Sequence, residues 1–93
     1  MKTDSTNKDM EILEKVFGQS LQQERKEKGM SQEELGMKSG FHRTYISLLE
    51  RGQKSPSLRT LFGLAAALEV EPVHFVQLLQ KRLKMINDSI REK

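Results

Sequence analysis

Two arginines and two hydroxyl side chains fall on one side of a stretch near the middle of this 93-residue chain. Arg43, Ser47 and Arg51 follow one another at intervals of four residues, and Thr44 comes directly after the first of them. In a helix this spacing brings all four side chains to the same side. Guanidinium and hydroxyl groups donate hydrogen bonds, and the arginines also attract negative charge. These residues therefore predict a recognition surface for an anionic partner.

The patterns that accompany catalysis or metal binding do not occur in the sequence. His42 and His74 are the only histidines, and the chain has no cysteine and no HExxH spacing, so we expect no metal site and no disulfide. No serine stands in a nucleophile-elbow pattern, and no glycine-rich loop is available to hold phosphates. We therefore expect no cofactor, no small-molecule ligand and no enzymatic activity.

The stretch that carries the recognition surface has the start and stop signals of two short helices. Ser31 followed three residues later by Glu34 is a capping box, which begins the first of them. Gly40 ends this helix, because glycine accepts the left-handed conformation without strain. The second helix is predicted from about His42 to Arg51. Since His42 stands where Ser, Thr or Asp usually caps a helix, the sequence leaves the cap of this helix open.

The other side of the second helix is predicted to face the core. Tyr45, Ile46 and Leu49 share that side. Gly36 lies inside the first helix, where glycine costs about 1 kcal/mol relative to alanine. Close approach of the second helix would explain this small residue, so the pair is expected to pack as a helix-turn-helix.

A longer helix is predicted before this pair. Residues 1–8 are polar and are expected to form a flexible leader. From about Asp9 to Gly29, the apolar Leu13, Phe17 and Leu21 recur every four residues and predict an amphipathic helix. Arg25 continues the same stripe, and its side chain either reaches water along the helix surface or meets a partner.

Two more helices are predicted after the pair. The loop 52–57 contains Pro56, and a fourth helix then runs to about Leu68. Pro72 suits the first turn of a fifth helix, whose apolar stripe continues nearly to the chain end. This stripe comprises Phe75, Leu79, Leu83, Ile86 and Ile90. We therefore expect an all-α fold with a domain at 9–80 and a helical extension at 81–93.

The net charge of +3 at neutral pH is concentrated near the recognition surface, because residues 38–59 contain five lysines or arginines and a single glutamate. The longest apolar run, 61–68, is far shorter than the ~20 residues that a membrane span needs. With no signal-peptide pattern either, the expected location is the cytoplasm, with no membrane partner.

The pattern resembles the Cro and phage-repressor (Xre-like) helix-turn-helix family over roughly residues 17–79. The positions that match the family's apolar and small residues are Leu35, Gly36, Gly40, Ile46 and Leu49. Within that family, RTYIS followed by LERG and PS looks most like the controller proteins of restriction-modification systems. The resemblance implies a compact five-helix domain that binds a palindromic operator on double-stranded DNA as a homodimer, with the third helix in the major groove.

The resemblance also implies roles for individual residues. The implied DNA-binding residues are Gln32, Arg43, Thr44, Tyr45, Ser47, Leu48, Arg51, Lys54, Ser55 and Arg59. Arg43 is expected to read guanine, because its forked donors fit the O6 and N7 acceptors. Lys54, Ser55 and Arg59 would lie near phosphates, as would the Tyr45 hydroxyl. Leu48 either packs on a thymine methyl group or is simply an exposed leucine.

Two further expectations concern contacts within and between chains. In the family, an arginine placed like Arg25 pairs with the glutamate that ends the recognition helix, which here is Glu50. The stripe of Leu79, Leu83, Ile86 and Ile90 is predicted to be the dimer interface, and the alternative is a frayed basic tail. Other functions compatible with the sequence are an antitoxin, a phage-type repressor, or a protein-interaction module that works through the C-terminal helix.

Overall fold

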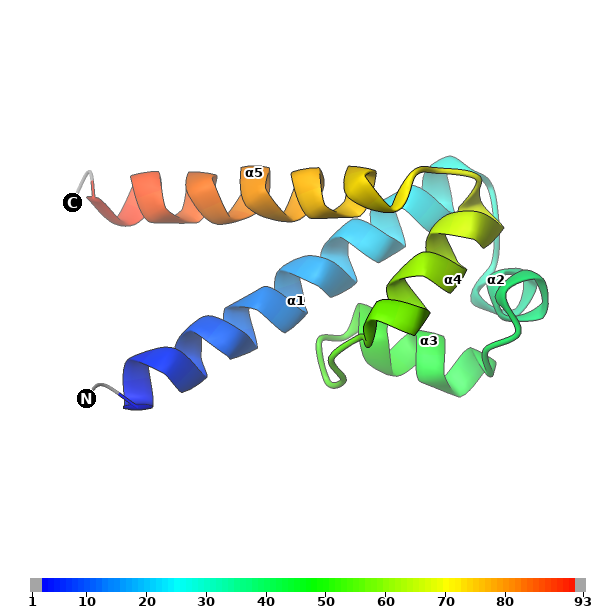
Figure 1. Cartoon of the computed structure of the whole chain (residues 1–93), viewed down its shortest axis with the longest axis horizontal. Helices are drawn as coiled ribbons and strands as arrows, with labels where there is room; N and C mark the ends of the chain where they lie inside the picture. Colours follow the sequence, from blue (N-terminus) through cyan, green and yellow to red (C-terminus); the bar gives the residue numbers. More distant parts are fainter. Residues whose placement is uncertain (1–2, 92–93) are drawn as a thin grey trace.

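Five helices and their connections make up the part of the chain described by the computed structural model, which covers the backbone of residues 3–91 and the side chains of residues 11–88 (Figure 1). The helices are α1 (Thr3–Glu27), α2 (Gln32–Ser39), α3 (Arg43–Glu50), α4 (Leu58–Leu68) and α5 (Pro72–Arg91). No strand occurs within residues 3–91. The predicted all-α class and the number and order of the helices are confirmed.

The short helices begin and end where their capping residues are. At the start of α2, the Glu34 N–H donates to Ser31 Oγ at 3.0 Å and the Ser31 N–H donates to Glu34 Oε1 at 2.8 Å. The pKa of Glu34 lies below its usual value. The largest cause is the hydrogen bond that the Ser31 backbone donates to the carboxylate, and the second is a hydrogen bond with the Ser31 side chain. Gly40, at φ +84°, ends α2 in the left-handed conformation. Ser57 caps α4 by accepting from the Thr60 N–H at 3.0 Å.

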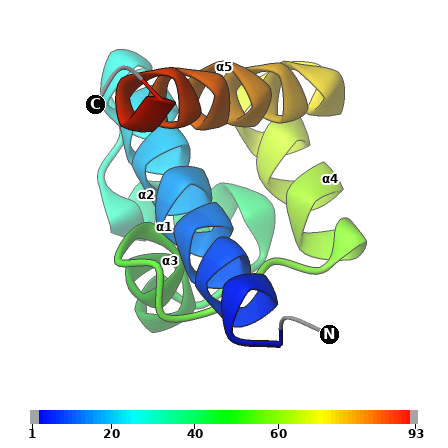
Figure 2. The ribbon, with the colours of Figure 1, turned by 90° about the vertical axis from the view of Figure 1, so that its left-hand side faces the viewer.

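The core lies where α2, α3 and α4 meet the middle of α1 and the start of α5 (Figures 1 and 2). Its fully or almost fully buried side chains are Phe17, Leu21, Leu35, Ile46, Leu49, Leu64, Ala65, Leu68 and Phe75. The rings of Phe17 and Phe75 pack with their centroids 5.7 Å apart and join α1 to α5. This core holds α2 and α3 against the rest of the domain.

The apolar stripe of α1 departs from the prediction at Leu13, which is 43% exposed. Four residues turn a helix by about 400°, so a side chain every fourth residue drifts about 40° per step around the axis. Leu21 and Phe17 are buried, but by Leu13 the drift has carried the stripe away from the core. Val16, which the prediction did not include, is buried instead.

The first helix also begins earlier than expected, at Thr3 instead of about Asp9. No glycine or proline precedes Gly18, so nothing in the local sequence ends the helix before the core. Residues 3–8, expected as a flexible leader, are the first turns of α1. Met1 and Lys2, the rest of that leader, lie outside the described residues.

The two long helices extend past the core and diverge (Figures 1 and 2). We call residues 3–14 the α1 arm and residues 81–91 the α5 arm. The arms give the molecule its long axis, 42 Å against 23 and 19 Å. Among the described residues no single helix is long and apolar enough to cross a membrane, and α4 and α5 pass that test only as a pair bent by 107°.

Candidate nucleic-acid interface

The position of α3 is set by its inner side. Ile46 and Leu49 are fully buried. A Cβ on Gly36 would lie 2.6 Å from the Phe41 carbonyl oxygen and 3.6 Å from Ile46 Cδ1. The turn therefore packs directly on α2, and α3 follows close behind it, which accounts for glycine at this position. Gly18 has the same effect on α1, since a Cβ there would lie 2.4 Å from the Leu49 carbonyl oxygen.

The outer side of α3 carries the side chains that the sequence singled out. Arg43, Thr44 and Arg51 are exposed, while Ser47 and Leu48 are half-buried. The guanidinium of Arg51 bends back along the helix, where its Nε donates to the Ser47 carbonyl oxygen at 3.4 Å. The structure thus brings these five residues together on one side. Leu48, half-buried, still presents part of its side chain outward.

The basic residues of the following loop extend this surface. Lys54 and Ser55 are exposed in the loop after α3, and Arg59 is exposed in the first turn of α4. The loop itself is short, and Ser57 ends it by capping α4. The exposed cations therefore lie on a defined backbone next to α3.

A buried ion pair ties the end of α3 to α1. Arg25 Nε donates to Glu50 Oε2 at 2.7 Å and Arg25 Nη2 donates to Glu50 Oε1 at 3.0 Å, with the side chains 10% and 2% exposed. The hydrogen bonds to Glu50 raise the pKa of Arg25 against the opposing effect of burial. The family resemblance implied this pair, and the guanidinium is buried with its partner instead of reaching water.

Two further groups complete that ion pair. Arg25 Nη1 donates to the Met30 carbonyl oxygen at 2.8 Å, and Gln32 Nε2 donates to Glu50 Oε1 at 2.9 Å. Gln32 was expected to contact DNA. In the structure it is half-buried and its amide nitrogen is bound to Glu50. The amide therefore helps to satisfy the buried carboxylate.

Tyr45 lies at the edge of the core side, as expected, but its hydroxyl is already engaged. It forms a 3.0 Å hydrogen bond with Thr60 Oγ1, and Ser57 Oγ donates to the same oxygen at 3.1 Å. Thr60 is buried at the start of α4. The contact joins α3 to the loop and helix that carry Lys54 and Arg59, so Tyr45 helps to position the basic surface.

Both histidines make contacts that sequence reasoning missed. His42 does cap α3, because its Nδ1 accepts from the Thr44 N–H at 3.0 Å. His74 lies near the start of α5. Its side chain is partly exposed, but Nε2 lies 3.0 Å from Oε2 of the buried Glu24 and so joins α5 to α1. No group of three or more metal-binding side chains occurs among the residues that the structure describes.

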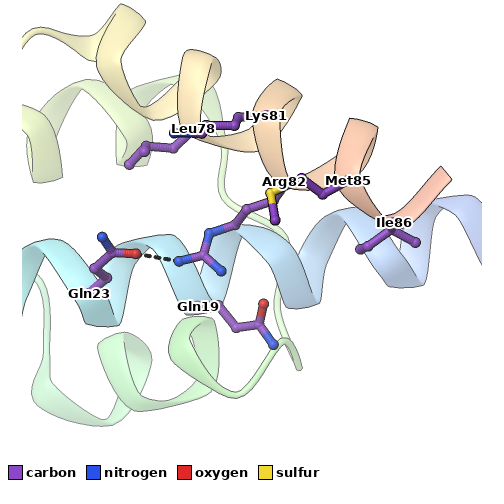
Figure 3. A pocket seen from close by; sticks show the side chains of 7 residues that line it. All are labelled: Gln19, Gln23, Leu78, Lys81, Arg82, Met85 and Ile86. Atoms are coloured by element: carbon purple, nitrogen blue, oxygen red, sulfur yellow. Dashed lines mark hydrogen bonds between the residues drawn. The ribbon is translucent and has the colours of Figure 1, made fainter. Parts of the chain in front are cut away.

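The apolar stripe of α5 is only partly covered. Leu79, Leu83 and Ile86 are half-buried, and Met85 is 63% exposed. The side chain of Ile90 lies outside the described residues. Where α1 and α5 begin to diverge they leave an open groove of about 440 Å³ (Figure 3). It is lined by Gln19, Gln23, Leu78, Lys81, Arg82, Met85 and Ile86. Figure 3 shows Arg82 reaching across to donate to Gln23.

Apolar side chains are also exposed elsewhere, which the sequence pattern did not indicate. Leu58 and Phe62 lie one turn apart on α4, and Val73 and Val76 lie one turn apart at the start of α5. Phe62 is 58% exposed and Val73 is 56% exposed. The sequence gives their spacing, but only the structure shows that these side chains lie outside the core.

The comparison with known proteins identifies this arrangement. The helix-turn-helix family matches residues 21–75. An uncharacterized HTH-type transcriptional regulator of Sinorhizobium fredii, y4dJ, is 44% identical over 64 residues, which are 69% of this chain and 83% of that protein. The control protein C.BamHI of Bacillus amyloliquefaciens is 45% identical over 58 residues, 61% of this chain and 72% of the relative.

A solved structure adds a nucleic-acid complex to these relatives. It is the restriction-modification controller protein C.Esp1396I, a tetramer in complex with its natural 35 base-pair operator. The match is 38% identical with a TM-score of 0.69, and it covers 74% of this chain and 91% of that one.

Proposed function

The chain belongs to the helix-turn-helix family of DNA-binding transcriptional regulators, and we propose that it binds a palindromic operator as a homodimer with α3 in the major groove. The observation that carries this proposal is the outer side of α3. Its exposed arginines and its two hydroxyls stand beside the exposed cations of the next loop, while Ile46 and Leu49 on its inner side are fully buried. A helix that is held in place by its buried side and carries hydrogen-bond donors on its exposed side can contact the edge of a base pair.

The contacts divide into those that read bases and those that hold phosphates. Arg43 reads guanine, and Thr44, Ser47 and Leu48 lie beside it on the same side of the helix. The DNA phosphate backbone is contacted by Lys54, Ser55, Arg59 and Arg51. Gln32 and Tyr45 are also proposed to contact DNA. In the free protein the polar group of Gln32 binds Glu50 and that of Tyr45 binds Thr60.

Within the family, we propose a controller protein of a restriction-modification system. A control protein among the relatives and a controller protein bound to its operator among the solved structures support this assignment. The alternatives are an antitoxin or a phage-type repressor built on the same domain. The protein is then a regulator and not an enzyme, and it acts in the cytoplasm, where its DNA is.

Dimerisation is assigned to the helical extension at 81–93, beyond a DNA-binding domain at 9–80. The interface would comprise Leu83, Ile86 and Ile90 in this extension, together with Leu79 at the end of the domain. Of these, the three with described side chains are half-buried, so each has apolar surface that a second copy can cover.

Selection of bound fragments from a random DNA pool tests the proposal. We expect enrichment of a palindromic site, with binding that weakens steeply as salt is added, because several phosphates are neutralised at once. Failure to enrich any sequence would contradict a sequence-specific regulator.

A second candidate is a protein-interaction module, which the exposed Met85 and the groove beside it favour. Apolar helix pairing does not weaken with salt as phosphate contacts do. Salt-insensitive self-association without DNA enrichment would select this function over the first.

A further inference from the structure

The cap of α3 determines which nitrogen of His42 carries a proton. Nδ1 accepts a hydrogen bond from the Thr44 N–H at 3.0 Å, so Nδ1 has a free lone pair. A neutral imidazole has one donor and one acceptor nitrogen, and a protonated one has two donors. The capping ring is therefore neutral, with its hydrogen on Nε2.

The remaining donor belongs to an exposed side chain at the start of α3. The two nitrogens of an imidazole point in nearly opposite directions, so the Nε2–H points away from the helix end that Nδ1 caps. His42 is exposed, directly before the exposed Arg43. Its surroundings are a shallow hollow, lined by Glu33, Gly36, Met37, Gly40, Phe41, His42 and Arg43. The donor thus stands at the start of α3, the end from which recognition helices contact base edges.

We propose that His42 is a DNA-contacting residue whose Nε2–H donates to an acceptor on the operator, either a phosphate oxygen or a purine N7. This inference rests on the proposed DNA-binding function and adds a contact to it. The usual caps, Ser, Thr or Asp, satisfy the helix end with a short side chain. The imidazole satisfies the same N–H and also extends a second donor toward the DNA. His42 is then a cap and a contact at once.

The first test separates the cap from the contact. His42→Ser retains a good capping oxygen but is too short to extend the second donor, so its unfolding midpoint should match the parent's. Its affinity for the selected operator should fall about five- to tenfold, the size of one hydrogen bond. His42→Ala, which lacks the cap too, should lose both stability and affinity. Unchanged operator affinity in His42→Ser overturns the inference, while operator binding by the parent keeps the proposed function intact.

The second test identifies the acceptor. Single methylphosphonate linkages remove phosphate charge, and 7-deazapurines remove N7, one position at a time. At the true partner, the change should weaken the parent but not His42→Ser, since the contact is already gone there. Coupling to a methylphosphonate assigns a phosphate, and coupling to a deazapurine assigns a base. If neither kind of substitution couples to His42 at any position of the half-site, the contact does not exist.

A third measurement needs no DNA. Nitrogen-15 NMR of the free protein at neutral pH should show an acceptor-type Nδ1 and a protonated Nε2 for His42, with the signal assigned by its loss in His42→Ser. The opposite tautomer overturns the inference, whatever the protein binds.

Discussion

The core of the helix-turn-helix region, residues 21–75, and the stripe of the α5 arm differ in how far the chain covers their apolar side chains. In the first, Leu35, Ile46 and Leu49 are fully buried, and every buried side-chain nitrogen or oxygen in the described part of the chain has a hydrogen-bond partner. In the α5 arm, Met85 is 63% exposed and the adjoining groove is open. The core of the helix-turn-helix is thus closed within one chain, whereas the α5 arm has apolar surface that a partner would stabilise, as do Leu58, Phe62 and Val73 on α4 and the start of α5.

The family match follows the same division. It covers residues 21–75 and so includes the ion pair, the turn and the basic loop, but not the arms. Local caps and a closed core hold α3 with its outer side exposed. We therefore expect the arms to contribute to association between copies of the chain.

The largest effect is expected when the helix-turn-helix loses its buried carboxylate. Glu50→Gln leaves Arg25 buried without a compensating charge, which costs roughly 3 to 5 kcal/mol. Urea unfolding of the variant measures this cost, with the exposed Glu71→Gln as the matched control. If Glu50→Gln is as stable as the parent, the region is held by its apolar residues alone.

An apolar replacement of the pair should recover only part of that stability. Arg25→Met with Glu50→Leu removes both charges, and apolar pairs of similar volume often replace buried salt bridges. Here, however, the Met30 carbonyl and the Gln32 amide also lose their partners. Complete recovery in the double variant would show that these two groups find water at no cost.

The next largest effect concerns the outer side of α3. Arg43→Ala should cost about 1 to 3 kcal/mol of operator affinity and relax preference at one base pair per half-site. Lys54→Ala is the matched control, since it should weaken all sequences alike and reduce the salt dependence. Filter binding to operator and random DNA measures both. Identical losses on the two DNAs would contradict the division into base and phosphate contacts.

Association should depend on the arms more than on the exposed apolar residues of α4 and the start of α5, which we call the corner. These are Leu58, Phe62, Val73 and Val76. Leu83→Glu places a charge on the half-buried stripe and should weaken self-association by about tenfold or more, because an apolar contact of this size contributes about 1.5 kcal/mol. Val73→Glu, at an exposed position of similar chemistry, is the control. Sedimentation at micromolar concentration measures both. A larger effect from Val73→Glu would move the interface to the corner, and a monomeric parent would contradict the dimer.

The features that sequence alone predicted well are those that neighbours along the chain determine. The capping box of Ser31 and Glu34 and the left-handed Gly40 depend only on residues within one turn, so the ends of α2 were readable. The ion pair of Arg25 and Glu50 joins distant positions, and only the family resemblance indicated it.

The features that sequence missed depend on how whole helices are placed. His74 contacts Glu24 because α5 packs alongside α1. The spacing of apolar residues within each helix does not predict which helices pack together. Leu13 is exposed because a stripe of fourth residues drifts around the helix. The cap by His42 was missed for a chemical reason, since a ring nitrogen is an uncommon acceptor at a helix start.

The smallest effect should come from the cap of α2 and should appear only as a pH dependence. The hydrogen bonds from Ser31 lower the pKa of Glu34 in the folded protein, so they stabilise the fold at pH values above the usual glutamate pKa. This stabilisation is lost as the pH falls through the lowered pKa. Glu34→Gln keeps an acceptor for the capping box but cannot titrate. The variant should therefore be slightly less stable than the parent at pH 7, and the difference should shrink as the pH falls below the usual glutamate pKa, as followed by thermal unfolding. Glu33→Gln changes a carboxylate in the same turn that is not part of the box. An equal pH-dependent difference for that control would assign the effect to the helix dipole and not to the bonds with Ser31.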